Sequence, residues 1–273
     1  MPKLQLKNRD KTGKSVNAGC IEIANHTNEQ ADIYFFGDIC SESWQSEWYA
    51  EDKCPKDVEE FLKDVDGVAT LNIHINSGGG SVFGGIAIYN LLKRHPANKI
   101  VYVDGVAASI ASVIAMAGDK IIVPKNAQLM VHKPWCYAAG DANDMKKTAE
   151  MLDTCQKSIL ATYMTKAREG VTEDAINALI ENETWLTGDK ASEYFNISLE
   201  ESCNAAACES TFFDIYKNIP EDLKKEKASA DELVDTVAKK VLEIVESNIA
   251  TKQAAAQENE ERKKAILADL DLI

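Results

Sequence analysis

The sequence lacks the features of several large protein classes. No uninterrupted apolar run reaches the ~20 residues that a helix needs to cross a bilayer, and no apolar segment of a secretory signal follows the basic residues at the N-terminus. Positive charge is also scarce, because 30 Lys and Arg residues stand against 44 Asp and Glu residues, which gives a formal net charge of −14. Nucleic acid and anionic membranes both need a basic face, so we expect neither as a partner.

Metal-binding and disulfide patterns are missing as well. The seven cysteines are odd in number and form no C-x-x-C pair. A zinc site needs clustered cysteine and histidine ligands, and the four histidines do not supply them. We therefore expect a cytoplasmic protein with reduced thiols and no metal.

What the sequence does contain is an alternation of strand and helix patterns with short connections. This order is typical of parallel β-α-β units, and it predicts an α/β fold. Strands are expected at 20–23, 31–36, 69–75, 100–103, 121–123 and 128–131. Helices are expected at 56–65, 82–94, 107–117, 144–168, 173–182 and 188–194.

The composition also predicts three regions along the 273 residues. Residues 1–18 are polar and are expected to be a flexible N-terminal segment. Residues 19–200 hold the strand and helix patterns of one domain. Residues 201–273 are expected to be a linker and an acidic helical tail, with an amphipathic helix at 229–249.

The chain is organised around residues 99–118, which read KIVYVDGVAASIASVIAMAG. A strand-like run is expected to break at Asp104-Gly105, after which an apolar helix follows. Ser109 would then lie at the start of a buried helix, where free N–H groups and the helix dipole favour negative charge. The alternative is that Ser109 is only a small residue in a tightly packed layer. Ser112, one helical turn further on, is expected to be dispensable.

Two other stretches suggest what Ser109 could do. Glycines 78–80 lie between a strand and a helix, where their N–H groups could bind an anion. Their spacing fits neither common phosphate-binding loop, which leaves an oxyanion hole or a plain flexible turn. His132 ends the apolar strand at 128–131, and a serine nucleophile needs such a base nearby. A half-buried polar residue is the other interpretation of His132.

These motifs together resemble the Clp-type serine peptidases. The resemblance is carried by residues 75–80 (INSGGG), 105–111 (GVAASIA), 129–134 (LMVHKP) and 183–191 (ETWLTGDKA), which occur in that order. It covers about residues 30–197. Each motif alone is weak, whereas their combined order and spacing are specific.

The resemblance implies a spiral of β-β-α units, the fold shared by Clp peptidases and crotonases. It implies that Ser109 is the nucleophile and His132 the general base, with an oxyanion hole formed by the N–H groups of Gly80 and Ile110. The family has an aspartate as the third triad member, and Glu183 occupies that position here. No metal or organic cofactor is implied.

The function that follows is a serine endopeptidase acting on polypeptides. The acidic tail and an N-terminus unlike the family's docking loop look more like the phage and prophage relatives that mature capsids, with capsid or scaffold proteins as substrates. Helix 144–168 would pair homo-oligomeric rings, as a heptamer or double heptamer. The alternatives are a general protein-degrading Clp subunit, a crotonase-type acyl-CoA enzyme and a non-catalytic assembly scaffold. The sequence leaves an ATPase partner open.

Overall fold

The computed structural model describes residues 3–9, 15–39, 59, 62–202, 208 and 210–223. The expected tail helix at 229–249 and half of the expected helix at 56–65 lie outside these residues. The described strands are β1 (Lys3–Arg9), β2 (Ser15–Ala24), β3 (Gln30–Gly37), β4 (Thr70–Ser77), β5 (Asn98–Ala108), β6 (Lys120–Pro124), β7 (Gln128–Val131), β8 (Thr184–Thr187) and β9 (Ser198–Glu200). The helices are α2 (Val82–Arg94), α3 (Ile110–Ala115), α4 (Ala142–Met164), α5 (Glu173–Glu181) and α6 (Gly188–Tyr194), with short 3-10 helices η1 (Thr211–Asp214) and η2 (Glu221–Leu223). The predicted α/β fold is confirmed.

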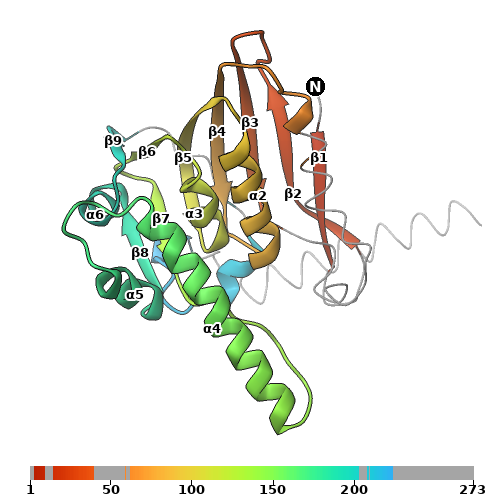
Figure 1. Ribbon diagram of the computed structural model, residues 1–273, viewed down its shortest axis with the longest axis vertical. Helices are drawn as coiled ribbons and strands as arrows, with labels where there is room; N and C mark the ends of the chain where they lie inside the picture. Colours follow the sequence, from red (N-terminus) through yellow and green to blue (C-terminus); the bar gives the residue numbers. More distant parts are fainter. Residues whose placement is uncertain are drawn as a thin grey trace, which may run out of the picture. The chain divides into compact units, whose positions relative to one another are not determined.

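The strands form one mixed sheet in the order β1-β2-β3-β4-β5-β6-β9 (Figure 1). The strands from β3 to β6 are parallel, as expected for β-α-β connections. Strand β5 has two partners along its length: residues 100–102 pair with β6, and residues 106–108 pair with β7. Strand β8 adds antiparallel to β7. The end of β5 therefore lies beside the end of β7.

The core lies between the sheet and its helices. In β4 the apolar residues Leu71, Ile73 and Ile75 are fully buried, in the alternation that a strand requires. Every residue of α3 is buried, and this helix contacts α2, β4 and β5. Burying aliphatic side chains of this kind contributes about 1.5–3 kcal/mol each, which holds the β5–α3 connection in place.

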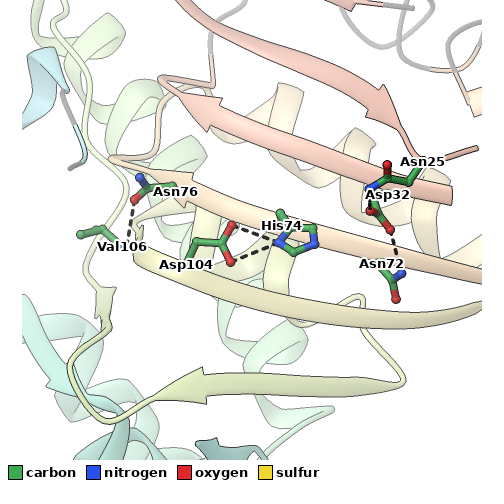
Figure 2. A network of polar contacts seen from close by, with 7 residues as sticks. All are labelled: Asn25, Asp32, Asn72, His74, Asn76, Asp104 and Val106. Atoms are coloured by element: carbon green, nitrogen blue, oxygen red, sulfur yellow. Dashed lines mark hydrogen bonds and ion pairs between the residues drawn. The ribbon is translucent and has the colours of Figure 1, made fainter. Parts of the chain in front are cut away.

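A line of polar and aromatic side chains crosses β3, β4 and β5 (Figure 2). Tyr34, His74 and Tyr102 are in register on these strands, and the His74 ring stacks on both tyrosines at centroid distances of 4.6 and 4.9 Å. Asp104 accepts a hydrogen bond from His74 Nδ1 at 3.0 Å. Asp104-Gly105 does not break the strand as expected, because the residues that follow it pair with β7. Strand β5 runs through both residues to Ala108.

One side chain fixes the connection between β4 and the glycine run at 78–80. The register between β4 and β5 shifts between Ile75 and Ser77. At that point Asn76 Oδ1 accepts the Val106 N–H at 3.1 Å, and both residues are buried (Figure 2). An asparagine can replace a ladder hydrogen bond in this way, so the glycine run keeps a fixed position relative to the end of β5.

The N-terminal region differs from the expected flexible segment at 1–18. Strand β1 pairs antiparallel with β2, and β2 pairs antiparallel with β3. Leu4 and Leu6 alternate with polar residues in the sequence, which is a strand pattern hidden within a polar composition. The expected boundary at residue 200 stays a prediction, although the first compact unit runs to Lys224.

The described residues hold neither a membrane-spanning helix nor a metal-binding cluster. No helix in this part of the chain combines the length and apolar character of a membrane span. Likewise, the described residues contain no group of three or more His, Cys, Asp or Glu side chains arranged to hold a metal ion.

Candidate active site

Ser109 forms a sharp turn between β5 and α3. Its φ of 55° lies in the left-handed region, which a non-glycine residue enters at a cost of about 1–3 kcal/mol. A strained strand-to-helix turn is the geometry that exposes a nucleophilic serine. Gly79 packs directly against it, since a Cβ at Gly79 would lie 2.6 Å from Ser109 Cβ. The turn expected at Asp104-Gly105 is thus four residues later, at Ser109 itself.

His132 lies against this serine. The Ser109 N–H donates to Met130 O at 2.9 Å, which ties the turn to the end of β7 two residues before the histidine. Ser109 Oγ and His132 Nε2 are then 2.6 Å apart. With the ring proton on Nδ1, Nε2 accepts a hydrogen bond from the hydroxyl. The structure therefore brings together the predicted nucleophile and the predicted base.

His132 is held in its neutral form. Burial lowers the pKa of its imidazole to about 4, because the charged ring loses its hydration. A neutral imidazole can accept the proton of Ser109, whereas a protonated one cannot. Between pH 4 and pH 6.5 the folded protein therefore keeps a base that the unfolded chain would protonate.

We expect this burial to make the folded state less stable in acid. The unfolded chain binds a proton at His132 below its ordinary pKa of 6.5, and the folded chain does not until about pH 4, so the free energy of unfolding falls as the pH drops through that window. The loss from this group is about 2.5 kcal/mol near pH 4.5. Denaturant unfolding of wild type and His132→Gln at several pH values measures it. An equal pH dependence in both proteins would contradict the burial of His132.

The Ser112 hydroxyl contacts the backbone of the Ser109 turn on its buried side. Its Oγ lies 2.5 Å from Ser109 O, 3.0 Å from Met130 O and 2.7 Å from the Tyr163 hydroxyl of α4, and both Ser112 and Tyr163 are buried. Burial also raises the pKa of the Tyr163 phenol, with the Ser112 hydrogen bond acting in the opposite direction. The network links the Ser109 turn to β7 and to α4.

This network gives Ser112 a structural role, while the expectation that it is dispensable as a nucleophile stays a prediction. Ser112→Ala leaves the Tyr163 hydroxyl without its buried partner, while the Ser109 carbonyl keeps only the N–H of residue 112 at 3.0 Å. We therefore expect a loss of about 1–3 kcal/mol in the free energy of unfolding. Tyr163→Phe removes only one donor and should cost less. Denaturant titration of both variants tests this. Wild-type stability in Ser112→Ala would show that the network contributes nothing.

The glycine run is fixed beside Ser109 by β-bridge hydrogen bonds. Ile39 N–H donates to Gly79 O at 2.6 Å, and Ser81 N–H donates to Ile39 O at 2.7 Å. The Gly80 N–H lies between these two bonds in the sequence. Ile110 is the first residue of α3, and the first N–H groups of a helix have no partner within it. The role of the Gly80 and Ile110 N–H groups as an oxyanion hole stays a prediction.

Glu183 is near His132 in the sheet, but its carboxylate has another partner. Val131 of β7 is opposite Thr184 of β8, so the next residues along the two strands, His132 and Glu183, continue the same register. Glu183 has a left-handed φ of 48°. Its Oε1 accepts the Asn218 N–H at 2.6 Å, and no hydrogen bond joins it to His132 in the described part of the chain. Its role as third triad member stays a prediction.

Comparison with known proteins agrees with this geometry. The profile of the Clp protease family matches residues 59–197, just over half of the chain. The chain belongs to the Clp protease family. The matched region includes the Ser109 turn, His132 and Glu183.

Single relatives give the same family. An ATP-dependent Clp protease proteolytic subunit of Bacteroides fragilis is 31% identical over 137 residues, which are 49% of this chain and 65% of that protein. The protein of that name from Ligilactobacillus salivarius is 33% identical over 137 residues, 49% of this chain and 68% of that protein. Proteolytic subunit 1 of Corynebacterium jeikeium is 30% identical over 140 residues, 49% of this chain and 71% of that protein. The match thus spans less than two thirds of the Bacteroides protein's length.

One part of this Clp family member's site lies beyond the family match. We call residues 210–223 the 210–223 segment. They pack against the Ser109 turn through an apolar cluster that the sequence did not predict. The cluster contains Val106, Ala108, Met130, Phe213 and Tyr216, with Trp185 packed against it. The sequence pattern that could have predicted this cluster is the run TFFDIY at 211–216, which is aromatic within an acidic region.

Proposed function

We propose that this Clp family member is a serine peptidase in which Ser109 attacks the peptide carbonyl. His132 takes the hydroxyl proton as general base and then delivers it to the leaving amine. The acyl-enzyme that forms on Ser109 Oγ is released by water, again with His132 as base. The 2.6 Å contact between Ser109 Oγ and His132 Nε2 carries this proposal. The strained turn at Ser109 and the neutral imidazole support it.

The oxyanion of the tetrahedral intermediate would be bound by the N–H groups of Gly80 and Ile110. Backbone donors at a fixed glycine turn and at a helix start cost little reorganisation during the reaction. Glu183 would orient the ring of His132 and stabilise the imidazolium. This last step needs its carboxylate to exchange the Asn218 N–H for His132 Nδ1.

The reaction class is tested by offering two kinds of substrate to the full-length protein. Peptidase chemistry predicts cleavage of short fluorogenic peptides and of an unfolded polypeptide, with loss of both activities in His132→Gln. A crotonase-type enzyme would instead turn over acyl-CoA and would not need a base beside Ser109. Acyl-CoA turnover without peptide cleavage would overturn the proposal.

We further propose that the substrates are capsid or scaffold proteins of a phage or prophage. The acidic region beyond the family match and the N-terminal sequence support this branch over a general degrading subunit. Ser109→Ala, produced together with phage head proteins, should retain those proteins as uncleaved substrates. Cleavage by the wild-type protein of unrelated unfolded proteins at equal rates would favour the degrading subunit.

A homo-oligomeric ring, as a heptamer or double heptamer, is also part of the proposal. The buried residues of α4 all lie in its second half, whereas Met145 and Met151 in the first half are 38% and 37% exposed. This half of the helix projects beyond the sheet (Figure 1). An apolar helix face of this kind is suited to pairing with another copy. Light scattering that shows a monomer at micromolar concentration would contradict it.

A further inference from the structure

The 210–223 segment packs beside the Ser109 turn, where Phe213 and Tyr216 cluster with Ala108 and Met130. Ser210 Oγ donates to Asp38 Oδ1 at 2.5 Å in a buried contact, which fixes the start of the segment near the glycine run. The approach is so close that a Cβ at Gly78 would lie 2.0 Å from Ser210 Oγ. The backbone on the approach to the predicted oxyanion hole is therefore covered by the chain's own residues.

Tyr216 lies nearest the chemistry. Its hydroxyl donates to Gly78 O at 2.5 Å, and its ring packs edge-on against the ring of His132 at a centroid distance of 5.2 Å. Burial raises the pKa of this phenol, and an interaction with the Ser109 hydroxyl offsets part of the rise. The bulky ring of Tyr216 therefore lies directly against His132, and Ser109 and His132 are each only partly exposed beside it.

The same segment also holds the predicted third triad member. Asn218 donates its backbone N–H to Glu183 Oε1 at 2.6 Å, and its side-chain amide donates to the carbonyls of Asn182 and Glu183 at 2.8 and 3.1 Å. These bonds keep the Glu183 carboxylate on the segment and away from a hydrogen bond with His132.

One buried donor where the 210–223 segment packs on the site has no hydrogen-bond acceptor among the described residues. The Trp185 indole N–H is buried without an acceptor among the described residues, beneath the rings of Phe213 and Tyr216. A buried donor without a partner is unfavourable, and displacement of the segment would let it bond to water or to substrate. The contact of the 210–223 segment with Trp185 can therefore be replaced by a contact with water or substrate.

We propose that the 210–223 segment is a built-in competitor of substrate, which covers the Ser109–His132 pair through Tyr216 and holds Glu183 away from His132. The inference rests on the proposed peptidase function. A substrate segment with a bulky aromatic or apolar residue can take the place of Phe213 and Tyr216 against Met130 and Trp185. Hydrolysis therefore requires the segment to move, and the site takes polypeptides that carry such residues.

The test compares Tyr216→Ala with Ile215→Ala in the full-length protein. Ile215 is 43% exposed on the same segment and serves as the matched control. A fluorophosphonate probe should label Ser109 of Tyr216→Ala at least about tenfold faster than wild type, because the fraction of uncovered sites rises. Ile215→Ala should stay within about twofold of wild type. Circular dichroism and thermal melting verify that each variant is folded.

Tyr216→Phe keeps the ring and removes only the hydrogen bond to Gly78 O. It should label faster than wild type and slower than Tyr216→Ala, and it keeps the test valid if the alanine variant does not fold. Labelling of Ser109 at one rate in all variants would overturn the inference and leave the peptidase proposal standing. Slower labelling in Tyr216→Ala would overturn it too, since Tyr216 would then assist catalysis. No labelling of Ser109 in any variant would reject both proposals.

Discussion

Replacing Ser109 with alanine is expected to lower the turnover of peptide hydrolysis by about a millionfold, because a serine peptidase without its nucleophile retains only binding and oxyanion stabilisation. Alanine has the same Cβ as serine and must adopt the same φ of 55°, so the strain of the turn is unchanged. The buried network beneath the turn uses the backbone carbonyl of residue 109 and survives the substitution. The fold and the melting temperature should therefore change little.

Initial rates with a fluorogenic peptide measure this effect. The comparison is best made in the Tyr216→Ala background as well, where the site is expected to be uncovered. Retention of even a tenth of the activity in Ser109→Ala would exclude Ser109 as the nucleophile.

Glu183→Gln is expected to lower turnover by at least ~100-fold with little change in stability. A carboxylate is needed to hold the imidazole of His132 in the correct tautomer and to stabilise its charged form, and an amide does neither. The glutamine side chain still offers an oxygen to the Asn218 N–H, so the resting contact is kept. A loss of turnover would thus report on catalysis rather than on folding.

Glu181→Gln is the matched control for Glu183→Gln. Glu181 lies at the end of α5, and its only charged partner in the described residues is Lys133 at 3.5 Å, in a pair that is about half exposed. Exposed pairs contribute little, so this variant should be near neutral. Equal, small effects from both substitutions would show that another group orients His132. Asp153, exposed on α4, would be the next candidate.

The sequence predicted the central part of the site because each residue there has a strong local signature. Ser109 lies between a run of strand-forming residues and a buried helix. His132 directly follows β7, which is the second strand after β5. Parallel strands of one sheet bring such ends together. The structure differs only in where the turn falls. The pairing of Val106 and Ala108 with β7 extends β5 past Asp104-Gly105, which the local composition does not reveal.

The parts that the sequence did not predict depend on contacts between distant residues. The Ser210–Asp38 bond joins positions 172 apart in the chain, and no spacing rule indicates it. Tyr216 and Asn218 lie beyond β9 in the sequence, and no local pattern places them beside Gly78 and Glu183. The composition of residues 201–273 predicts a linker and an acidic helical tail, although the aromatic run at 211–216 favours burial.

The measurement that tests the account most directly is identification of the residue modified by a fluorophosphonate. Full-length wild type, Tyr216→Ala, His132→Gln and Ser109→Ala would be treated with the probe, digested and sequenced by tandem mass spectrometry. We predict modification at Ser109 in wild type and in Tyr216→Ala, a strong reduction in His132→Gln and none in Ser109→Ala. Modification at another serine, or undiminished labelling of Ser109 without His132, would contradict a Ser109 nucleophile activated by His132.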